Sequence, residues 1–331
     1  MENQTPDAEN LKARLPDSVA VRVQSIKNVD GVVTLVLDVA GMEADSRSGL
    51  ESAVKAMIGE APGVSEVRVA MVADRVMRRI VAVGSGKGGV GKSTLTANLA
   101  VALKKMGHKV GVVDADVYGP SQPTILDNKG AKPEARDEKL VPVPSPLGIP
   151  VLSMGHLVEP GKALAWRGPM AGNAMAQLID AHWGDTDLLL IDLPPGTGDV
   201  QLTMLSKFKP VGAVIVSTPQ DLALIDAQRA ANLFDSGKVP IIGLVENMSG
   251  YACPHCNEIS HPFGQGGVEA ASEGTGIPFL GRIPLAMNIR EASDAGKPPA
   301  AGDGPDAEPF MAVAEKLSEW LASPIAASEA A

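Results

Sequence analysis

The sequence has 331 residues, a formal net charge of −10 and a pI near 5.1. A chain this acidic is not expected to bind nucleic acid through the phosphate backbone, and 3% aromatic residues leave few rings for stacking on bases. A hydrophobic share of 45% and a charged share of 21% are those of a globular protein with room for a large core and a second, smaller domain. The first residues lack the pattern of a signal peptide, and no apolar run reaches the ~18 residues of a membrane span. We therefore expect a cytoplasmic protein with no membrane partner.

The first 76 residues predict a small α+β domain behind a loose start. Residues 1–18 are expected to form a disordered tail. Residues 19–27 and 32–39 have strand patterns and are joined through Asp30-Gly31, a dipeptide typical of tight hairpins. Residues 47–59 have helical spacing, and residues 64–72 read as a further strand. The predicted domain spans residues 19–76 with a ββαβ order.

From residue 78 to residue 322 the pattern changes to short apolar strands that alternate with helices. Near-continuous apolar strands of this kind favour an α/β fold, with a mostly parallel sheet covered by helices on both faces. The strands are expected at 80–83, 109–113, 151–153, 188–191, 213–217, 241–245 and 279–283. The helices are expected at 93–106, 170–181, 200–207, 222–234 and 310–321. Residues 298–309 read as a mobile loop, and residues 323–331 as a disordered tail.

A phosphate-binding loop follows the first of these strands. Residues 86–93 satisfy the pattern G-x-x-x-x-G-K-[ST], between a predicted strand and a predicted helix. Glycines allow the main-chain N–H groups to curl around an anion, and the helix directs its positive end at the phosphates. Lys92 is expected to reach the terminal phosphates and Ser93 to ligate Mg²⁺. The predicted nucleotide-binding residues are Gly86, Lys87, Gly88, Gly89, Val90, Gly91, Lys92, Ser93 and Thr94, and the nucleotide is ATP.

Carboxylates end two other predicted strands. Asp114 and Asp116 close the strand at 109–113, and Asp192 closes the strand at 188–191. After a phosphate-binding loop, an aspartate in the position of Asp192 is expected to support Mg²⁺ together with Ser93. The Pro- and Gly-rich residues 193–199 follow Asp192 and are expected to act as a switch beside the γ-phosphate.

Cys253 and Cys256 are the only cysteines of the chain, three positions apart. In a reducing compartment, this spacing argues for metal or redox chemistry over a structural disulfide. Three readings stay open from the residues: an iron–sulfur cluster, a zinc ion shared with His255 or His261, and a redox dithiol. The dithiol is disfavoured because the segment after Cys256, with Pro262, does not read as a helix.

The phosphate loop carries a second lysine, Lys87, at its front edge. The segment from Lys87 to Lys92 resembles the deviant Walker A motif of the MinD, ParA and nitrogenase iron protein group. This resemblance implies that Lys87 reaches the nucleotide of a partner subunit, and that Asp116 orients the attacking water. The catalytic residues it implies are Lys87, Lys92 and Asp116.

Further motifs occur in a fixed order, and together they resemble the Mrp/ApbC family of iron–sulfur cluster carrier ATPases over residues 78–322. They are Trp166-Arg167-Gly168-Pro169-Met170, the segment 192–199, Glu246-Asn247-Met248-Ser249, Cys253-Pro254-His255-Cys256, Gly281-Arg282-Ile283-Pro284-Leu285 and Ile289-Arg290-Glu291-Ala292. The resemblance implies slow ATP hydrolysis, an adenine contact from Asn247, and a cluster bound by Cys253 and Cys256.

The same resemblance implies a homodimer, in which two chains supply four thiolates to one [4Fe–4S] cluster that is delivered to apo-proteins. The alternative is a zinc-stabilised regulatory or partitioning switch of the ParA/MinD kind. A membrane-bound version is disfavoured because Lys316 is the only base in the predicted helix at 310–321. Residues 19–76 resemble the small iron–sulfur-assembly domain often fused to such proteins, but they contain no cysteine, and no cluster chemistry is assigned to them.

Overall fold

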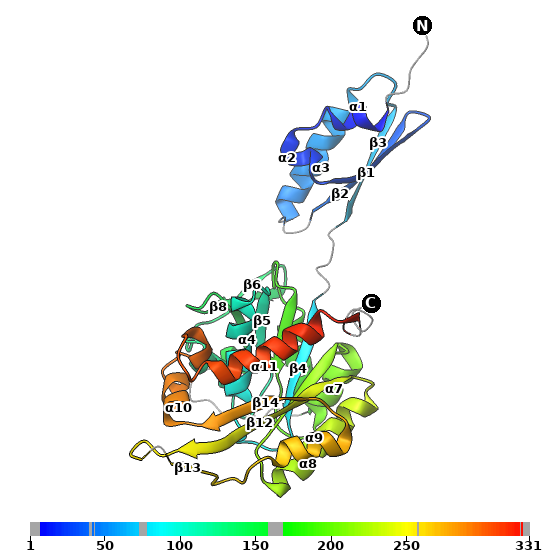
Figure 1. The fold of residues 1–331 in the computed structure, drawn as a ribbon. Helices are drawn as coiled ribbons and strands as arrows, with labels where there is room; N and C mark the ends of the chain where they lie inside the picture. The colour runs from blue at the N-terminus through cyan, green and yellow to red at the C-terminus, as the bar shows by residue number, and fades with distance from the viewer. Residues whose placement is uncertain are drawn as a thin grey trace. The chain divides into compact units, whose positions relative to one another are not determined.

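A computed structural model describes residues 7–324 and 326, except 40, 41, 43, 73–77, 158–167, 257 and 325. The chain divides into two compact units, Met1–Met77 and Arg78–Ala331 (Figure 1). None of the helices in the described ranges is long and apolar enough to cross a membrane.

The N-terminal unit is a three-stranded sheet backed by helices. Strands β1 (Val23–Val29) and β2 (Val32–Asp38) are antiparallel, and β3 (Glu66–Val72) pairs parallel with β2. The turn between β1 and β2 places Asp30 and Gly31 at positive φ, as a two-residue hairpin of matching twist requires. Helix α3 (Ala44–Gly59) packs Val54 and Ile58 on the sheet, so the predicted ββαβ order is confirmed.

The expectation of a disordered tail over residues 1–18 is wrong for the part from residue 7 onward. Helices α1 (Ala8–Lys12) and α2 (Asp17–Ala20) form there, and Asp7 caps the first of them. Leu11 and Leu15 are buried in the core of the unit. Leu11 lies in α1 and Leu15 in the bend between α1 and α2, and the burial of both side chains orders this short segment. Residues 1–6 lie outside the described residues.

The C-terminal unit contains a nine-stranded sheet in the order β13-β12-β11-β4-β10-β5-β9-β8, with β14 paired to β12. All the pairings are parallel except β12 with β13 and β8 with β9. The strands are β4 (Arg79–Ser85), β5 (Val110–Asp114), β8 (Val143–Pro144), β9 (Pro150–Ser153), β10 (Leu188–Asp192), β11 (Gly212–Ser217), β12 (Ile241–Ala252), β13 (Ile259–Ser260) and β14 (Phe279–Leu285). A separate hairpin pairs β6 (Glu134–Arg136) with β7 (Lys139–Val141).

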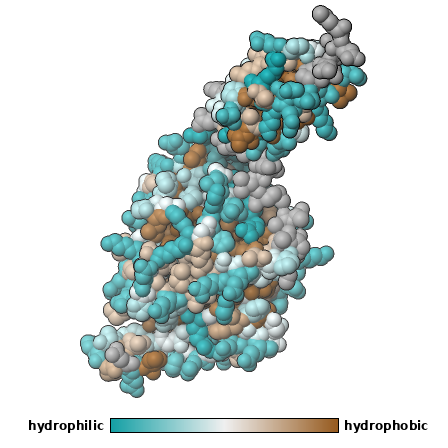
Figure 2. Space-filling view, turned by 45° about the horizontal axis from the view of Figure 1, so that its top comes forward, coloured by the Kyte–Doolittle hydropathy of each residue, from teal (hydrophilic) through white to brown (hydrophobic). Residues whose placement is uncertain are grey.

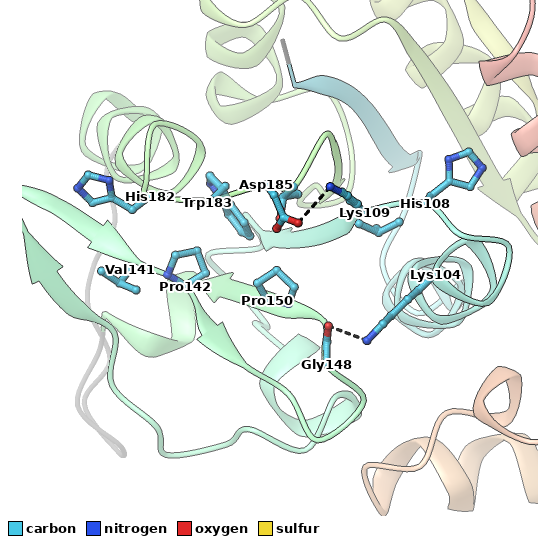
Figure 3. Close-up of a pocket in the computed structure, with 13 residues that line it drawn as sticks. Lys104, His108, Lys109, Val141, Pro142, Gly148, Pro150, His182, Trp183 and Asp185 are labelled. Carbon is cyan, nitrogen blue, oxygen red and sulfur yellow. Dashed lines mark hydrogen bonds and ion pairs between the residues drawn. The ribbon is translucent and has the colours of Figure 1, made fainter. Parts of the chain in front are cut away.

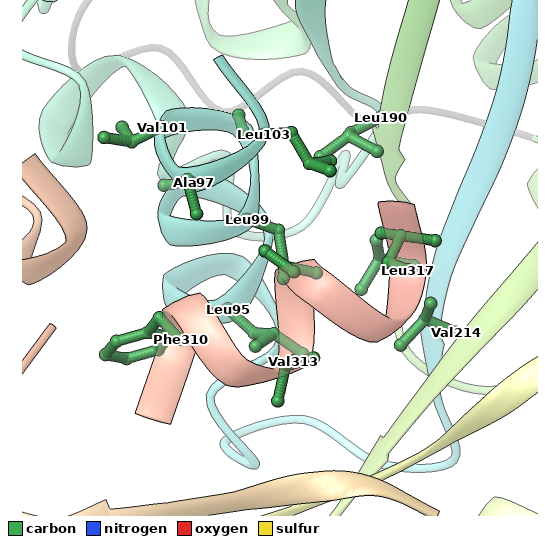
Figure 4. Packing of buried hydrophobic residues seen from close by; sticks show 14 of the residues in the cluster. Leu95, Ala97, Leu99, Val101, Leu103, Leu190, Val214, Phe310, Val313 and Leu317 are labelled. Carbon is green, nitrogen blue, oxygen red and sulfur yellow. The ribbon is translucent and has the colours of Figure 1, made fainter. Parts of the chain in front are cut away.

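Helices cover both faces of this sheet, which confirms the predicted α/β fold. Alternate residues of β4 face opposite layers, with Val81 and Val83 in one core cluster and Ile80 and Ala82 in the other. The first cluster joins α4 (Lys92–Lys105) and α11 (Glu308–Leu321), as Figure 4 shows. The second joins α6 (Gly168–Ile179), α7 (Asp199–Lys207) and α8 (Asp221–Ser236).

Several elements of this unit differ from the sequence prediction. The expected loop at 298–309 contains a 3₁₀ turn, η2 (Pro299–Ala301), whose buried Ala300 N–H donates to Asn98 Oδ1 over 2.8 Å. Helices α5 (Gln122–Ile125), α9 (Gly267–Thr275) and α10 (Met287–Asp294) and the 3₁₀ turn η1 (Met154–His156) were not predicted. These elements are short, and short segments give weak periodicity.

The candidate nucleotide site and the cysteine arm

The phosphate loop joins β4 to α4 with the local geometry that an anion site requires. Gly89 and Gly91 have φ of 78° and 85°, a conformation that residues with a Cβ atom adopt rarely. Gly91 precedes the first residue of α4 and has no side chain to cap it. The main-chain N–H groups of the first helical turn are therefore available to a phosphate, and the helix dipole favours negative charge at the same place.

Lys92 lies at the centre of a buried cluster of charges. Its side chain is only 6% exposed, and its Nζ donates to Asp192 Oδ1 and lies 3.7 Å from Asp116 Oδ2. The Ser93 hydroxyl accepts from the same ammonium over 3.4 Å. Burial opposes the charge of Lys92, yet the combined attraction of the neighbouring carboxylates raises its pKa above the usual value. The structure thus brings together the predicted phosphate lysine, the predicted Mg²⁺ residues and the predicted water-orienting aspartate.

Strand register explains why these carboxylates meet. Asp192 is paired with Val83 of β4 on one side and with Asp114 of β5 on the other. Asp114 accepts hydrogen bonds from the Gln122 N–H, the Ser153 hydroxyl and the Asp116 N–H over 3.1, 2.9 and 3.2 Å. Complete burial, together with the negative charge of Asp192, raises the pKa of Asp114 to about 7.

Gln122 belongs to the site, and sequence reasoning did not identify it. Its side chain is completely buried, and its Nε2 donates to Asp192 Oδ2 over 2.8 Å and to the Ser93 carbonyl oxygen over 2.9 Å. The sequence offers no signal for this role, because Gln122 lies between Pro120 and Pro123, at the start of a four-residue helix, and matches no phosphate-binding motif.

Lys87 lies apart from the Lys92 cluster. Its Nζ donates to Gln220 Oε1 over 3.0 Å, and the Thr218 hydroxyl lies 3.4 Å from the same oxygen. The Ser85 hydroxyl holds the Lys87 carbonyl oxygen over 3.0 Å, so the loop is fixed while its lysine side chain points to the start of α8. The structure therefore does not place Lys87 on the carboxylates that hold Lys92.

Asn247 touches the back of the phosphate loop. Its Nδ2 donates to the Val90 carbonyl oxygen over 2.8 Å. A Cβ atom added at Gly91 would lie 2.0 Å from that nitrogen, so a glycine is required for this close approach. The adenine contact expected of Asn247 stays a prediction, while its contact with the loop is a structural fact.

The proline- and glycine-rich segment after Asp192 runs beside the phosphate loop. The Gly196 N–H donates to the Ser85 carbonyl oxygen over 2.9 Å. Buried Gln201, in the first turn of α7, donates to the carbonyl oxygens of Pro194 and Gly196 over 2.6 and 3.1 Å. The predicted switch segment is thus held at Pro194 and Gly196 by hydrogen bonds to the phosphate-loop side and to α7.

Cys253 and Cys256 lie at the tip of an arm made by β12 and β13, which we call the cysteine arm (residues 251–260). Figure 1 shows this arm leaving the body of the C-terminal unit, and Figure 2 shows the same projection in space-filling form. Both thiols are free. Hydrogen bonds from the main-chain N–H of His255, then from the N–H and the thiol of Cys256, lower the pKa of Cys253. N–H groups aimed at one sulfur favour its thiolate, the form that binds metals.

The arm carries only part of a metal-binding set. In the portion of the chain that the structure describes, no group of three or more His, Cys, Asp or Glu side chains is placed to hold a metal ion. His261 Nδ1 lies 3.2 Å from the Ser249 carbonyl oxygen, and its ring packs at 3.4 Å from the position of a Cβ atom at Gly250. Within the described residues, the two cysteines thus supply only two of the four ligands of a tetrahedral site.

A separate cavity of about 380 Å³ lies near the amino-terminal end of the same parallel strands (Figure 3). Lys104, His108, Lys109 and His182 line it, but Lys104 donates to the carbonyl oxygens of Leu147 and Gly148, and Lys109 pairs with Asp185 at 3.2 Å. None of the predicted site residues lines this cavity. It is therefore distinct from the nucleotide site.

Comparison with known proteins agrees with this geometry. Residues 76–318 match the ParA family model described as "NUBPL iron-transfer P-loop NTPase". An "Iron-sulfur cluster carrier protein" of Pseudomonas fragi is 44% identical over 282 residues, which are 84% of this chain and 91% of the relative. The "Iron-sulfur protein required for NADH dehydrogenase, mitochondrial" of Arabidopsis thaliana is 52% identical over 225 residues, which are 67% and 71% of the two chains.

Solved structures show the same fold. A nucleotide-binding protein of Archaeoglobus fulgidus in complex with ADP is 40% identical with a TM-score of 0.60, over 70% of this chain and 91% of that chain. The cell division ATPase MinD of Pyrococcus furiosus is 27% identical with a TM-score of 0.54, over 73% and 99% of the two chains. The phosphate loop, the buried carboxylates and the sequence match thus lead to one conclusion: the chain belongs to the NUBPL-type iron-transfer P-loop NTPases of the ParA family.

Proposed function

We propose that the protein is an ATPase that carries an iron–sulfur cluster between two copies of its chain and delivers it to apo-proteins. The observation that carries this proposal is the pair of free cysteines, half-buried Cys253 and exposed Cys256, half of a ligand set, directly after the strand that also touches the phosphate loop. β12 extends from Ile241 to Ala252, with an irregularity between Asn247 and Tyr251, so Asn247 and the start of the cysteine arm belong to one element. The relatives named as carriers agree with this assignment, and the partitioning switch is not favoured.

The nucleotide site fits ATP with Mg²⁺. Hydroxyl and carboxylate oxygens are the donors that Mg²⁺ prefers, and Ser93, Asp192 and Asp116 provide them around Lys92. Bound Mg²⁺ would neutralise the negative charge that develops on the phosphates. With nucleotide bound, Lys92 would leave the carboxylates and contact phosphate, and Asp116 would orient the attacking water. We infer that hydrolysis is slow and coupled to cluster loading or transfer.

The position of Lys87 and the surface around it support a homodimer. Tyr118 is 82% exposed in the loop after Asp116, and Leu222 and Ile225 are 75% and 51% exposed in the first turns of α8. A Cβ atom at Gly86 would meet the main chain of Asp226, so α8 lies directly against the phosphate loop. A second copy that covers this edge would bury these apolar side chains and bring its own Lys87 to the nucleotide.

Mixing two inactive variants tests the role of Lys87. Lys87→Ala and Lys92→Ala chains should each fail to hydrolyse ATP as homodimers. A heterodimer of the two has one composite site, in which an intact Lys92 of one chain meets an intact Lys87 of the other. Recovered ATPase activity on mixing is expected. Inactive mixtures in which heterodimers are demonstrated would contradict the trans role.

Anaerobic reconstitution tests the cluster. With iron and sulfide, we expect one [4Fe–4S] cluster per dimer, measured as iron and sulfide per chain and as thiolate-to-iron absorption. Cys253→Ala and Cys256→Ala should each abolish it, because each removes two of four ligands from the dimer. His255→Ala and His261→Ala are the matched controls from the same arm and should retain it. One zinc per chain with no bound iron, lost in either histidine variant, would instead support a zinc site. Delivery to apo-proteins and a cytoplasmic location stay predictions.

A further inference from the structure

In the side-chain amide of Gln122, the nitrogen has hydrogen-bond partners and the oxygen has none among the described residues. Its Nε2 donates to Asp192 Oδ2 over 2.8 Å and to the Ser93 carbonyl oxygen over 2.9 Å. Its main-chain N–H donates to Asp114 Oδ2 over 3.1 Å. Its Oε1 is buried and has no hydrogen-bond partner among the described residues. A buried amide oxygen without a partner costs free energy, so its retention at this place calls for an explanation.

The orientation of this amide group follows from the chemistry of its neighbours. Both groups that face Nε2 are acceptors, one a carboxylate and the other a main-chain carbonyl. If the amide were flipped, Oε1 would face two acceptors and two hydrogen bonds would be lost. Oε1 is therefore the free acceptor, and it belongs to the same amide group that holds Asp192, at the side of the site where Mg²⁺ is proposed.

We propose that Gln122 is a positioning residue for Mg²⁺: its Nε2 fixes the Asp192 carboxylate against the Ser93 main chain, and its Oε1 accepts a hydrogen bond from a water molecule bound to the metal. Mg²⁺ keeps several of its waters in proteins, and each of these waters is a strong donor to a protein acceptor. Bound metal would thus supply a partner for the Gln122 amide oxygen, which has none among the described residues. This proposal rests on the proposed function, because it assumes that nucleotide binds with Mg²⁺.

The test compares ADP binding to the full-length protein in MgCl₂ and in EDTA by isothermal titration calorimetry. Gln122→Met keeps the length of the side chain and removes its polar atoms, and Gln122→Leu does the same with a shorter side chain. In both variants we expect the gain in ADP affinity from Mg²⁺ to fall about tenfold, the effect of losing one hydrogen bond to a charged partner. ADP affinity in EDTA should fall much less than ADP affinity in MgCl₂, because the hydrogen bond from Nε2 to the Ser93 carbonyl oxygen is lost in both conditions, whereas the contact with metal-bound water is lost only in MgCl₂.

Asn128→Leu is the matched control. Asn128 is also a buried amide with an oxygen that lacks a partner among the described residues, but its Nδ2 faces the Val143 carbonyl oxygen at 3.4 Å and no residue of the nucleotide site. This variant should keep the full gain from Mg²⁺. If Gln122→Leu does not fold, Gln122→Met decides the question.

The outcomes separate this proposal from the one on which it rests. A wild-type protein whose ADP affinity does not respond to Mg²⁺ would overturn the magnesium assignment itself. A wild-type gain that both Gln122 variants retain would overturn the role of Gln122 alone. Equal loss of affinity in MgCl₂ and in EDTA would show that Gln122 only supports the fold of the site, and it would also overturn the proposal.

Discussion

Replacing Lys92 by methionine should destabilise the C-terminal unit as well as abolish ATP hydrolysis. The sequence alone places Lys92 in an exposed loop, whereas the structure buries its side chain to 6% exposure against Asp192, which is completely buried. Methionine keeps most of the volume, so little cavity is created. The variant leaves a buried carboxylate without its cation, which costs about 3–5 kcal/mol of unfolding free energy at pH 8.

This loss should depend on pH in a definite direction. In the folded protein the charge of Lys92 lowers the pKa of Asp114 relative to what burial alone would give, so without the lysine Asp114 takes up a proton more readily as the pH falls. We therefore expect the destabilisation to be smaller near pH 5.5 than at pH 8. The double variant Lys92→Met/Asp192→Asn removes both charges and should recover much of the lost stability at pH 8 while remaining inactive.

Urea unfolding followed by tryptophan fluorescence measures this effect in the right part of the chain. The three tryptophans, at positions 166, 183 and 320, all belong to the C-terminal unit, so the signal does not include the N-terminal unit. The measurement is made in EDTA without nucleotide. Lys105→Met, on the same helix, is the matched control, because its ion pair with Asp303 is exposed and is worth about 1 kcal/mol or less. If Lys92→Met is no more destabilising than Lys105→Met at pH 8, the reasoning about the buried charges is wrong.

Three further predictions concern the same unit. Because burial raises the pKa of Asp114 from its ordinary 3.8 to about 7, the folded unit binds a proton that the unfolded chain releases, so this group's contribution to stability falls as pH rises from about 4 to 7. Asp114→Asn should flatten the curve of urea midpoint against pH over that window, and an unchanged slope would contradict the assignment. Gly86→Ala would place a Cβ atom 2.0 Å from the main-chain carbon of Asp226, so we expect nucleotide affinity to fall at least tenfold and the free energy of unfolding to fall by about 1–3 kcal/mol. Gly88→Ala is the control: its Cβ atom would meet only Pro195 at 3.8 Å, so it should keep wild-type stability in the same unfolding assay. A chain that begins at Arg78 should remain folded and bind ADP and cluster, as calorimetry and iron analysis would show; a folded truncation that holds no iron would mean that the N-terminal unit contributes to the site.

The parts of the site that could be predicted are those that depend on local spacing or on strand ends. The phosphate loop is contiguous in the sequence, so the motif formed by its glycines and its lysine can be recognised without knowledge of the fold. Asp114 and Asp192 end neighbouring parallel strands, and parallel register then brings their carboxylates together.

The parts that could not be predicted depend on how distant segments return to the site. Gln122 reaches Asp192 only because residues 115–121 turn back over the end of β5, and no periodicity or motif marks that turn. The burial of Lys92 depends in the same way on three carboxylates from two other strands. Leu11 and Leu15 order a segment that looks like a polar tail by composition, because their burial needs the sheet that forms later in the chain.

The cysteine arm has a thermodynamic consequence for whatever it binds. Two pairs of strand residues, Tyr251 with Ser260 and Ala252 with Ile259, and one hydrogen bond from the Cys253 N–H to the Glu258 carbonyl oxygen over 2.9 Å join its two sides. Among the described residues of the arm, 251–256 and 258–260, none is a buried apolar residue, so opening the arm exposes little hydrophobic surface and should require much less free energy than unfolding the unit. Amide hydrogens of the arm should therefore exchange with solvent long before those of β4 or β10. Each binding event must fix this easily opened arm in one conformation. This requirement weakens the affinity of the arm for its ligand relative to that of a rigid, preformed site. A group bound by such an arm can remain bound until the protein meets an acceptor. It can then be transferred to that acceptor if the acceptor's binding residues are already in position.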